Sequence, residues 1–314
     1  MVSAEYFKID NIKTIQLISE YANQYSAAGD KTLIDYLRGG NNYRTGNWQG
    51  YRGDLIADID LGKIKEVSSL THGGHIDEEK FERQLRWIMK NWDIIDPKIF
   101  EKVIRGQEKL KKDSLLLTFD DGTMSNFYVA KNILKKLNIR ALFFVVSEYV
   151  LINNIKASKI FAAENIMLTN NLSDVPDNFE NMKINHLKDL SKDGHIIGSH
   201  TLSHARLSSL SNQEIEKEIN DGVNLLEELM GYPILHFAYP FGDIKSIGTD
   251  ASHVACKRFQ FTYTGMRGDN GETKHGSNLM RDSNDPNDSL WYMGVSLEGL
   301  FDRLYSKKIN LINT

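Results

Sequence analysis

Short apolar runs alternate along the chain with segments in which apolar residues recur every three or four positions. The runs have the length of buried strands and cover residues 114–119, 140–146, 195–199, 235–239 and 259–264. The segments before and between them have the spacing of amphipathic helices, with positions such as Phe81, Leu85, Ile88 and Trp92. Strand, helix and strand in this order predict βαβ units and a parallel sheet, and therefore an α/β fold.

Some helix boundaries follow from local sequence. Ser211 with Glu214 three residues later is the capping-box pattern of a helix start, and Gly231 is a natural helix stop. A further helix is expected around residues 11–25, where apolar residues recur at helical spacing. Residues 38–53 are polar, Gly-rich and aromatic. This segment is either a connector or a lip that binds sugar.

The strand predicted at 114–119 ends in two adjacent carboxylates. Asp120 and Asp121 are followed by Gly122, and Asp-Gly is a common surface-turn dipeptide. Adjacent residues at a strand end point to opposite sides, so a turn at Gly122 can direct one of the two carboxylates elsewhere. The alternative to a surface turn is thus a site in which one carboxylate binds a metal and its neighbour acts as a base.

Two histidines four residues apart favour the second alternative. His200 and His204 follow the strand predicted at 195–199. Within one helical turn this spacing places both imidazoles on the same face, a common way to present two nitrogens to one ion. With one of the two Asp residues they form a set of two histidines and one carboxylate, which leaves open positions for water and substrate.

Composition narrows the class of protein. The chain has 314 residues, 41% of them hydrophobic and 25% charged, with a formal net charge of -4. These values are typical of a globular protein and argue against nucleic acid as a partner. No window approaches the roughly 20 apolar residues of a membrane span, and charges interrupt the apolar positions of the first thirty residues. With Cys256 as the single cysteine, we expect a cytoplasmic protein without a transmembrane segment.

Three motifs resemble those of a known family. The residues 118–122, Thr-Phe-Asp-Asp-Gly, and 200–204, His-Thr-Leu-Ser-His, look like the first and second motifs of the polysaccharide deacetylases, the NodB-homology or family 4 carbohydrate esterases. Residues 237–242, Phe-Ala-Tyr-Pro-Phe-Gly, look like the third motif, in the subgroup with Phe-Ala-Tyr-Pro. The resemblance covers roughly residues 70 to 285.

The resemblance implies a distorted, incomplete (β/α)7 barrel of the NodB type. We expect residues 1–65 to form an N-terminal extension that packs on the barrel and residues 66–314 to form the catalytic domain. Residues 151–185 are expected to be an insertion, either a lid or side wall of the site or a loop without function.

The resemblance also implies roles for single residues. Asp120 is the expected catalytic base, and the expected metal ligands are Asp121, His200 and His204. The cofactor is a divalent metal ion, with zinc as the default and cobalt, nickel or iron as alternatives. Tyr239, Pro240 and Phe241 are expected to bind substrate, with a backbone amide at or near Phe241 as oxyanion donor.

Two further assignments rest on departures from the family pattern. Many relatives have an arginine where this chain has Ala238, and that arginine holds the catalytic Asp. Arg281, in Leu-Met-Arg, resembles the arginine that replaces it in the subgroup. The general acid is expected to be His275, with His72 and His75 as rivals, and His75 is also a candidate substrate contact.

The resemblance implies metal-dependent removal of an N-acyl group from an amino sugar. We expect an N-acetyl group on a precursor of a bacterial surface polysaccharide such as O-antigen or capsule, whether nucleotide-linked, lipid-linked or an oligosaccharide. One alternative is a sugar N-deformylase with the same residues. A second, from another class, is an inactive relative that only binds carbohydrate.

Overall fold

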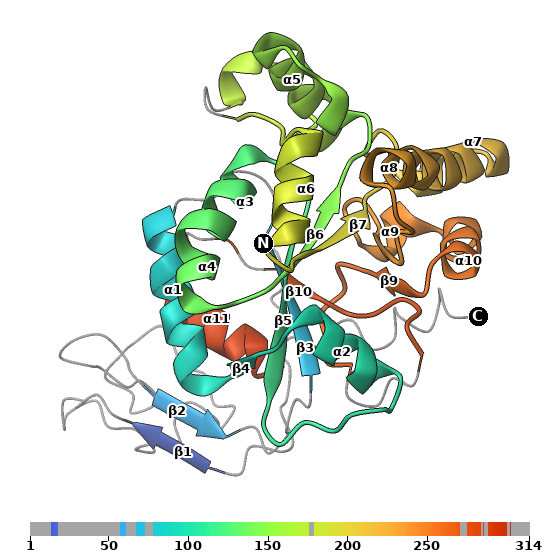
Figure 1. Cartoon of the computed structure of the whole chain (residues 1–314). Coiled ribbons are helices and arrows are strands. Elements are labelled where there is room, and N and C mark those ends of the chain that lie inside the picture. The colour runs from blue at the N-terminus through green and yellow to red at the C-terminus, as the bar shows by residue number, and fades with distance from the viewer. Residues whose placement is uncertain are drawn as a thin grey trace, which may run out of the picture. The chain divides into compact units, whose positions relative to one another are not determined.

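The structure is a computed structural model of the chain (Figure 1). It describes residues 14–17, 57–60, 67–72, 78–175, 179–270, 275–283, 285, 288–299 and 302, and for the first three ranges the backbone only. The chain divides into two compact units, Met1–Ile64 and Lys65–Thr314. That residues 1–65 pack on the barrel stays a prediction, and the segment 38–53 and His75 lie outside the described residues.

The first unit contains a pair of strands. β1 (Thr14–Leu17) pairs antiparallel with β2 (Ala57–Asp60). The helix expected around residues 11–25 is therefore wrong at 14–17. The four residues Thr-Ile-Gln-Leu also alternate between polar and apolar, and pairing with a distant strand selects this two-residue period over the helical one.

The second unit is built on a parallel sheet. Its strands follow the order β10-β3-β5-β6-β7-β8-β9, and β4 pairs with the start of β5. The strands are β3 (Val67–His72), β4 (Asp93–Ile94), β5 (Ser114–Phe119), β6 (Leu142–Val145), β7 (Ile196–Ser199), β8 (His236–Ala238), β9 (Phe261–Tyr263) and β10 (Asp282–Ser283). Seven strands in one curled path confirm the incomplete (β/α) barrel.

A C-terminal segment connects the two ends of this path. Leu279 forms a parallel bridge with Tyr263 of β9, and Asp282 and Ser283 then pair with β3. Residues 279–283 therefore lie between β9 and β3. From this position the Arg281 side chain reaches Asp120 at the carboxyl end of β5.

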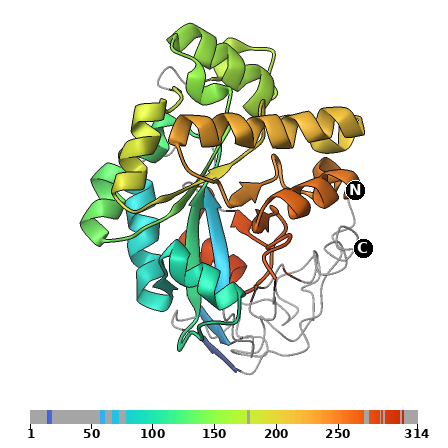
Figure 2. The same cartoon turned by 45° about the vertical axis from the view of Figure 1, so that its right-hand side comes forward.

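Both faces of the sheet are buried, which explains the continuous apolar strands. On β5, Leu115 and Leu117 pack in the main core and Leu116 packs in a second cluster. The second cluster includes Phe100 and Ile104 of α2 (Pro97–Ile104), the helix that covers the inner face. The main core lies between the other face and the surrounding helices (Figure 2).

The surrounding helices follow the strands in sequence. They are α1 (Glu78–Asn91), α3 (Met124–Val129), α4 (Lys135–Leu137), α6 (Ile184–Lys192), α7 (Asn212–Glu216), α8 (Gly222–Met230), α9 (Ile244–Ile247), α10 (Thr249–Arg258) and α11 (Leu290–Leu297). π-Helical turns at 130–134 and 217–221 join α3 to α4 and α7 to α8. The predicted capping box of Ser211 and Glu214 and the left-handed stop at Gly231 are both present. None of the helices in the described part of the chain could span a lipid bilayer.

Residues 151–185 have a small core of their own. They contain α5 (Ile155–Phe161), a π-helical turn at 162–166 and a 3-10 turn at 172–174. Tyr149 stacks on Phe161 with ring centroids 5.0 Å apart, in a cluster with Ala162, Val175 and Phe179. In Figure 1, α5 projects beyond the ends of β6 and β7. The segment is thus packed structure beside the carboxyl ends of the strands.

Candidate metal centre and active site

Three side chains meet in a buried cluster at the carboxyl ends of β5 and β7. Nε2 of His200 lies 3.6 Å and Nε2 of His204 lies 3.4 Å from Oδ1 of Asp121. The three ligand atoms lie within 4.8 Å of one another. Asp121, His200 and His204 have only 6%, 1% and 5% of their surface exposed. The structure therefore brings together the three residues that the sequence suggested as ligands.

Both imidazoles are held by backbone carbonyls. Nδ1 of His200 lies 2.7 Å from the carbonyl oxygen of Ala238, and Nδ1 of His204 lies 2.7 Å from that of Asn165. A carbonyl can only accept, so each Nδ1 carries the proton and each Nε2 has its lone pair free. Two nitrogens and one carboxylate oxygen with this outer support fit a divalent transition metal ion.

Burial and charge act on the two imidazoles in opposite ways. Burial lowers the pKa of His200 and so favours the neutral form that a metal ligand needs. Burial also lowers the pKa of His204, but the hydrogen bond and charge of Asp121 outweigh it, and the net direction is upward. Asp121 is thus close enough to His204 to stabilise a positive charge on its imidazole.

Two turns with positive φ direct residues into the site. Asp121 has φ of 71°, and the N–H of Gly122 donates to the carbonyl of Asp120 at 2.9 Å. Phe241 has φ of 62°, and the N–H of Gly242 donates to the carbonyl of Pro240 at 2.7 Å. These are γ-turns at the ends of β5 and β8, a strained conformation for residues other than glycine. The turn expected at the Asp pair is therefore centred on Asp121 itself.

The histidine pair lies on a loop, so the expected helical turn is wrong. Thr201 and His204 both have φ of 67°, and this backbone, instead of the helical period, brings the imidazoles together. The loop is clamped because Ser203 donates twice to the carboxylate of Glu218, from its N–H at 3.0 Å and its hydroxyl at 2.7 Å. A Cβ on Gly222 would lie 2.7 Å from the backbone nitrogen of Leu202, so only glycine allows α8 to approach this closely.

Asp120 lies beside the cluster and contacts a buried arginine. Nη1 and Nη2 of Arg281 donate to the two carboxylate oxygens of Asp120 at 2.7 and 3.0 Å. The Nε–H of Arg281 donates to the carbonyl of Thr264 at 2.8 Å, and its guanidinium lies 5.3 Å from the ring centroid of Phe144. The Arg281 side chain is 2% exposed. This is the pair suggested by the Leu-Met-Arg element, in bidentate geometry.

The residues of the third motif lie partly in the site and partly in the core. The Phe241 ring lies 4.8 Å from the His204 ring, and Pro240 is buried beside it. Tyr239 is 1% exposed and donates to Oδ1 of Asn278 at 2.9 Å, within the main core. The expectation that Tyr239 binds substrate is therefore corrected, because alternation along β8 places it with Phe237 on the face that the helices cover.

The candidate general acids lie in different places. His275 is exposed. The next residue, Gly276, accepts a hydrogen bond at its carbonyl from the N–H of Thr262 in β9, and it lies against the carbonyl oxygen of Gln260. His275 thus lies near the amino ends of the strands, and the structure does not bring it to the metal cluster. The backbone of His72 is in register with Phe119, directly before Asp120.

Sequence reasoning missed the groups that hold the ligands in place. These are the carbonyls of Ala238 and Asn165, the carboxylate of Glu218 and the close approach at Gly222. A carbonyl contact leaves no pattern in side-chain identity. A glycine within an apolar helical stretch was the one available signal, because it is unfavourable there without a packing reason.

The fold and the cluster define an α/β-barrel protein with a candidate metal centre. Residues 107–256 match the family model of the polysaccharide deacetylases. This part, just under half of the chain, therefore corresponds to a polysaccharide deacetylase domain. Deacetylases of this family are hydrolases that act on amide bonds of N-acetylated sugars, generally with a metal ion.

Similar proteins agree with this assignment. The peptidoglycan-N-acetylglucosamine deacetylase of Bacillus cereus is 29% identical over 136 residues, 42% of this chain and 38% of that protein. YxkH of Bacillus subtilis is 23% identical over 168 residues, 53% of this chain and 51% of that protein. The chain thus spans about half or less of the length of these curated relatives.

Solved structures show the same fold. The deacetylase PplD of Streptococcus pyogenes, in complex with acetate, superposes with a TM-score of 0.58. The comparison covers 75% of this chain and 99% of PplD at 18% identity. At this identity the likeness concerns the fold alone.

Proposed function

We propose that this protein is a metal-dependent hydrolase that removes an N-acetyl group from an amino sugar. The observation that carries the proposal is the bidentate contact of Arg281 with Asp120, directly beside the ligands Asp121, His200 and His204. A structural protein has no need of a carboxylate that a buried arginine orients next to three such ligands, whereas hydrolysis needs a base there.

Asp121, His200 and His204 would hold a divalent ion, which would supply a Lewis acid for the amide carbonyl and for water. Asp120 accepts the proton of the attacking water, and Arg281 holds its carboxylate in one orientation. The N–H of Phe241 has no acceptor among the described residues, and it donates to the oxyanion that forms at the former carbonyl. We propose that His72, whose strand pairs with β5, protonates the leaving amine.

The proposed substrate is a precursor of a bacterial surface polysaccharide such as O-antigen or capsule, and the proposed metal is zinc. The cytoplasmic location stays a prediction. A sugar N-deformylase is the second candidate, because the bulky Phe241 ring lies 4.8 Å from the His204 ring and a formyl group needs less space there than an acetyl group.

The test begins with metal content, which needs no substrate. Untagged protein purified without chelator is compared with His200→Ala and with His195→Asn, which changes a buried histidine outside the cluster. We expect about one equivalent of a divalent transition metal in the wild type and the control, and its loss in His200→Ala. Matched N-acetyl and N-formyl amino sugars then separate deacetylase from deformylase by release of acetate or formate.

Two results contradict the proposal. The first is wild-type protein that holds no metal even after exposure to zinc, which favours the relative that only binds carbohydrate. The second is hydrolysis that Asp120→Asn leaves unchanged, because the base would then lie elsewhere.

A further inference from the structure

Six of the eight arginines in the described part of the chain form an ion pair with an acidic side chain. The two others are Arg83 and Arg206. An exposed arginine without an acidic partner is common on a protein surface. Arg206 differs from Arg83 because other groups hold it in place.

Two contacts hold the guanidinium of Arg206. Its Nη1 donates to the hydroxyl of Ser246, which in turn donates to the carboxylate of Asp243 at 2.6 Å. Its Cζ lies 4.5 Å from the ring centroid of Phe241, a cation–π distance. The Ser246 side chain is buried, and Asp243 is the N-cap of α9. The guanidinium is thus anchored on one edge and on one face.

The anchored guanidinium lies next to the metal cluster. The same Phe241 ring contacts His204 on one side, at 4.8 Å, and Arg206 on another. Arg206 is itself two residues from His204 and is exposed to solvent. Its Nε and Nη2 have no acceptor among the described residues, so a positively charged group with free donors stands at the edge of the site.

We propose that Arg206 binds an oxyanion group of the substrate, a phosphate or a carboxylate, and so selects anionic N-acyl amino sugars over neutral ones. A guanidinium presents paired donors that match the oxygens of either group. Because two contacts already limit its motion, little side-chain entropy is lost on binding. This proposal depends on the proposed function only for the identity of the sugar. It is tested by binding measurements, which do not require hydrolysis.

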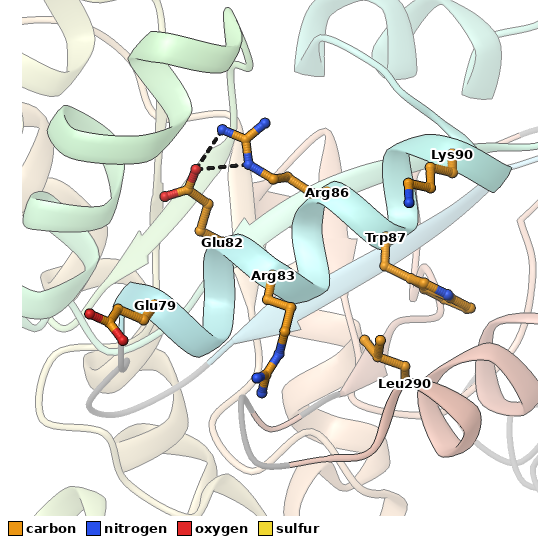
Figure 3. Close-up of a pocket in the computed structure, with 7 residues that line it drawn as sticks. All are labelled: Glu79, Glu82, Arg83, Arg86, Trp87, Lys90 and Leu290. Atoms are coloured by element: carbon orange, nitrogen blue, oxygen red, sulfur yellow. Dashed lines mark hydrogen bonds and ion pairs between the residues drawn. The ribbon is translucent and has the colours of Figure 1, made fainter. Parts of the chain in front are cut away.

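The probes are N-acetylglucosamine 1-phosphate, N-acetylmuramic acid and N-acetylglucosamine, which carry a phosphate, a carboxylate and no charge. Dissociation constants are measured by calorimetry on zinc-loaded wild type, Arg206→Gln and Arg83→Gln. Arg83 is the matched control, because it is also exposed and without an ion pair. It lies on α1 at the pocket between α1 and the start of α11, with its side chain turned away from Glu82 (Figure 3).

We expect the wild type to bind at least one anionic probe about ten- to a hundredfold more tightly than the neutral sugar. Arg206→Gln removes this preference and leaves binding of the neutral sugar unchanged, and Arg83→Gln behaves as the wild type. The probe whose preference is lost tells phosphate from carboxylate. Added salt reduces the preference, as expected for an exposed charge.

The proposal is overturned if the wild type binds all three sugars equally, or if Arg206→Gln keeps the preference. It is also overturned if the variant weakens all three equally, because Arg206 then only supports Phe241. Acetate release is recorded separately. If the protein prefers the anionic probes but releases no acetate or formate, the hydrolase proposal is rejected and the anion site stands. If it releases acetate or formate but shows no preference for the anionic probes, the anion site is rejected and the hydrolase proposal stands.

Discussion

The pair of Asp120 and Arg281 allows the most specific prediction about stability. Arg281→Met removes two charge-assisted hydrogen bonds to the Asp120 carboxylate, at 2.7 and 3.0 Å. It also removes the hydrogen bond from Nε of Arg281 to the carbonyl of Thr264. Methionine keeps the apolar contact with Phe144. Loss of one partner from a buried pair costs about 3–5 kcal/mol of unfolding free energy. Because the Asp120 side chain is 15% exposed and water can reach it, we expect a loss of about 3 kcal/mol, at the lower end of this range.

The double variant is the sharper test. Asp120→Asn alone leaves the Arg281 guanidinium, 2% exposed, without its counter-ion and should also destabilise the protein. Asp120→Asn with Arg281→Met leaves no uncompensated charge. We therefore expect a loss smaller than the sum of the single losses by at least about 1.5 kcal/mol.

Urea unfolding of chelator-treated protein measures these free energies without a contribution from bound metal. Arg258→Met is the control. Arg258 also lies over a phenylalanine ring and donates to Glu227 at 2.8 Å, but its side chain is 30% exposed, so about 1 kcal/mol or less is expected. Additive single losses, with a coupling below about 0.5 kcal/mol, would refute the reasoning.

Two further predictions concern the histidine loop and pH. In Gly222→Ala the new Cβ would lie 2.7 Å from the nitrogen of Leu202 and 2.9 Å from the carbonyl carbon of Thr201. The histidine loop must then shift, so zinc affinity should fall about tenfold or more although no ligand changes. An unchanged affinity in a zinc titration would show that the close approach at Gly222 does not hold the loop. Burial lowers the pKa of His195 from 6.5 to about 4, so unfolded protein binds the proton first, and stability should fall by about 3 kcal/mol between pH 6.5 and 4. His195→Asn, whose amide oxygen can still accept from Ala141, should flatten this part of the curve, and an equally steep curve would place the proton elsewhere.

The sequence predicted the α/β rhythm because the information is local. Period and apolar content are visible in short windows, and the capping box and the helix stop at Gly231 depend on neighbouring residues. The helix expected around residues 11–25 failed at 14–17 for the complementary reason. That strand pairs with residues 57–60, and such pairing is not visible in a local window.

Side-chain direction was only partly predictable. Strand alternation relates Tyr239 to Phe237, but both faces of this sheet are buried and apolar, so the pattern does not say which face meets the substrate. His275 was chosen by its position along the chain, whereas the parallel run of residues 276–283 beside β9 begins near the amino ends of the strands. Distance along the chain carries little information on which end of a sheet a residue occupies.

The sequence by itself determined the fold class and the residue types of the candidate site, because both are written in contiguous motifs at the ends of predicted strands. Only the tertiary structure decided how those residues are held. Arg281 meets Asp120 across 161 positions of sequence, and the carbonyls of Ala238 and Asn165 hold imidazoles that lie 38 and 39 positions away. Such contacts form only when the sheet curls and the C-terminal segment lies between β9 and β3. Groups so far apart in sequence come within hydrogen-bonding distance only in the folded chain.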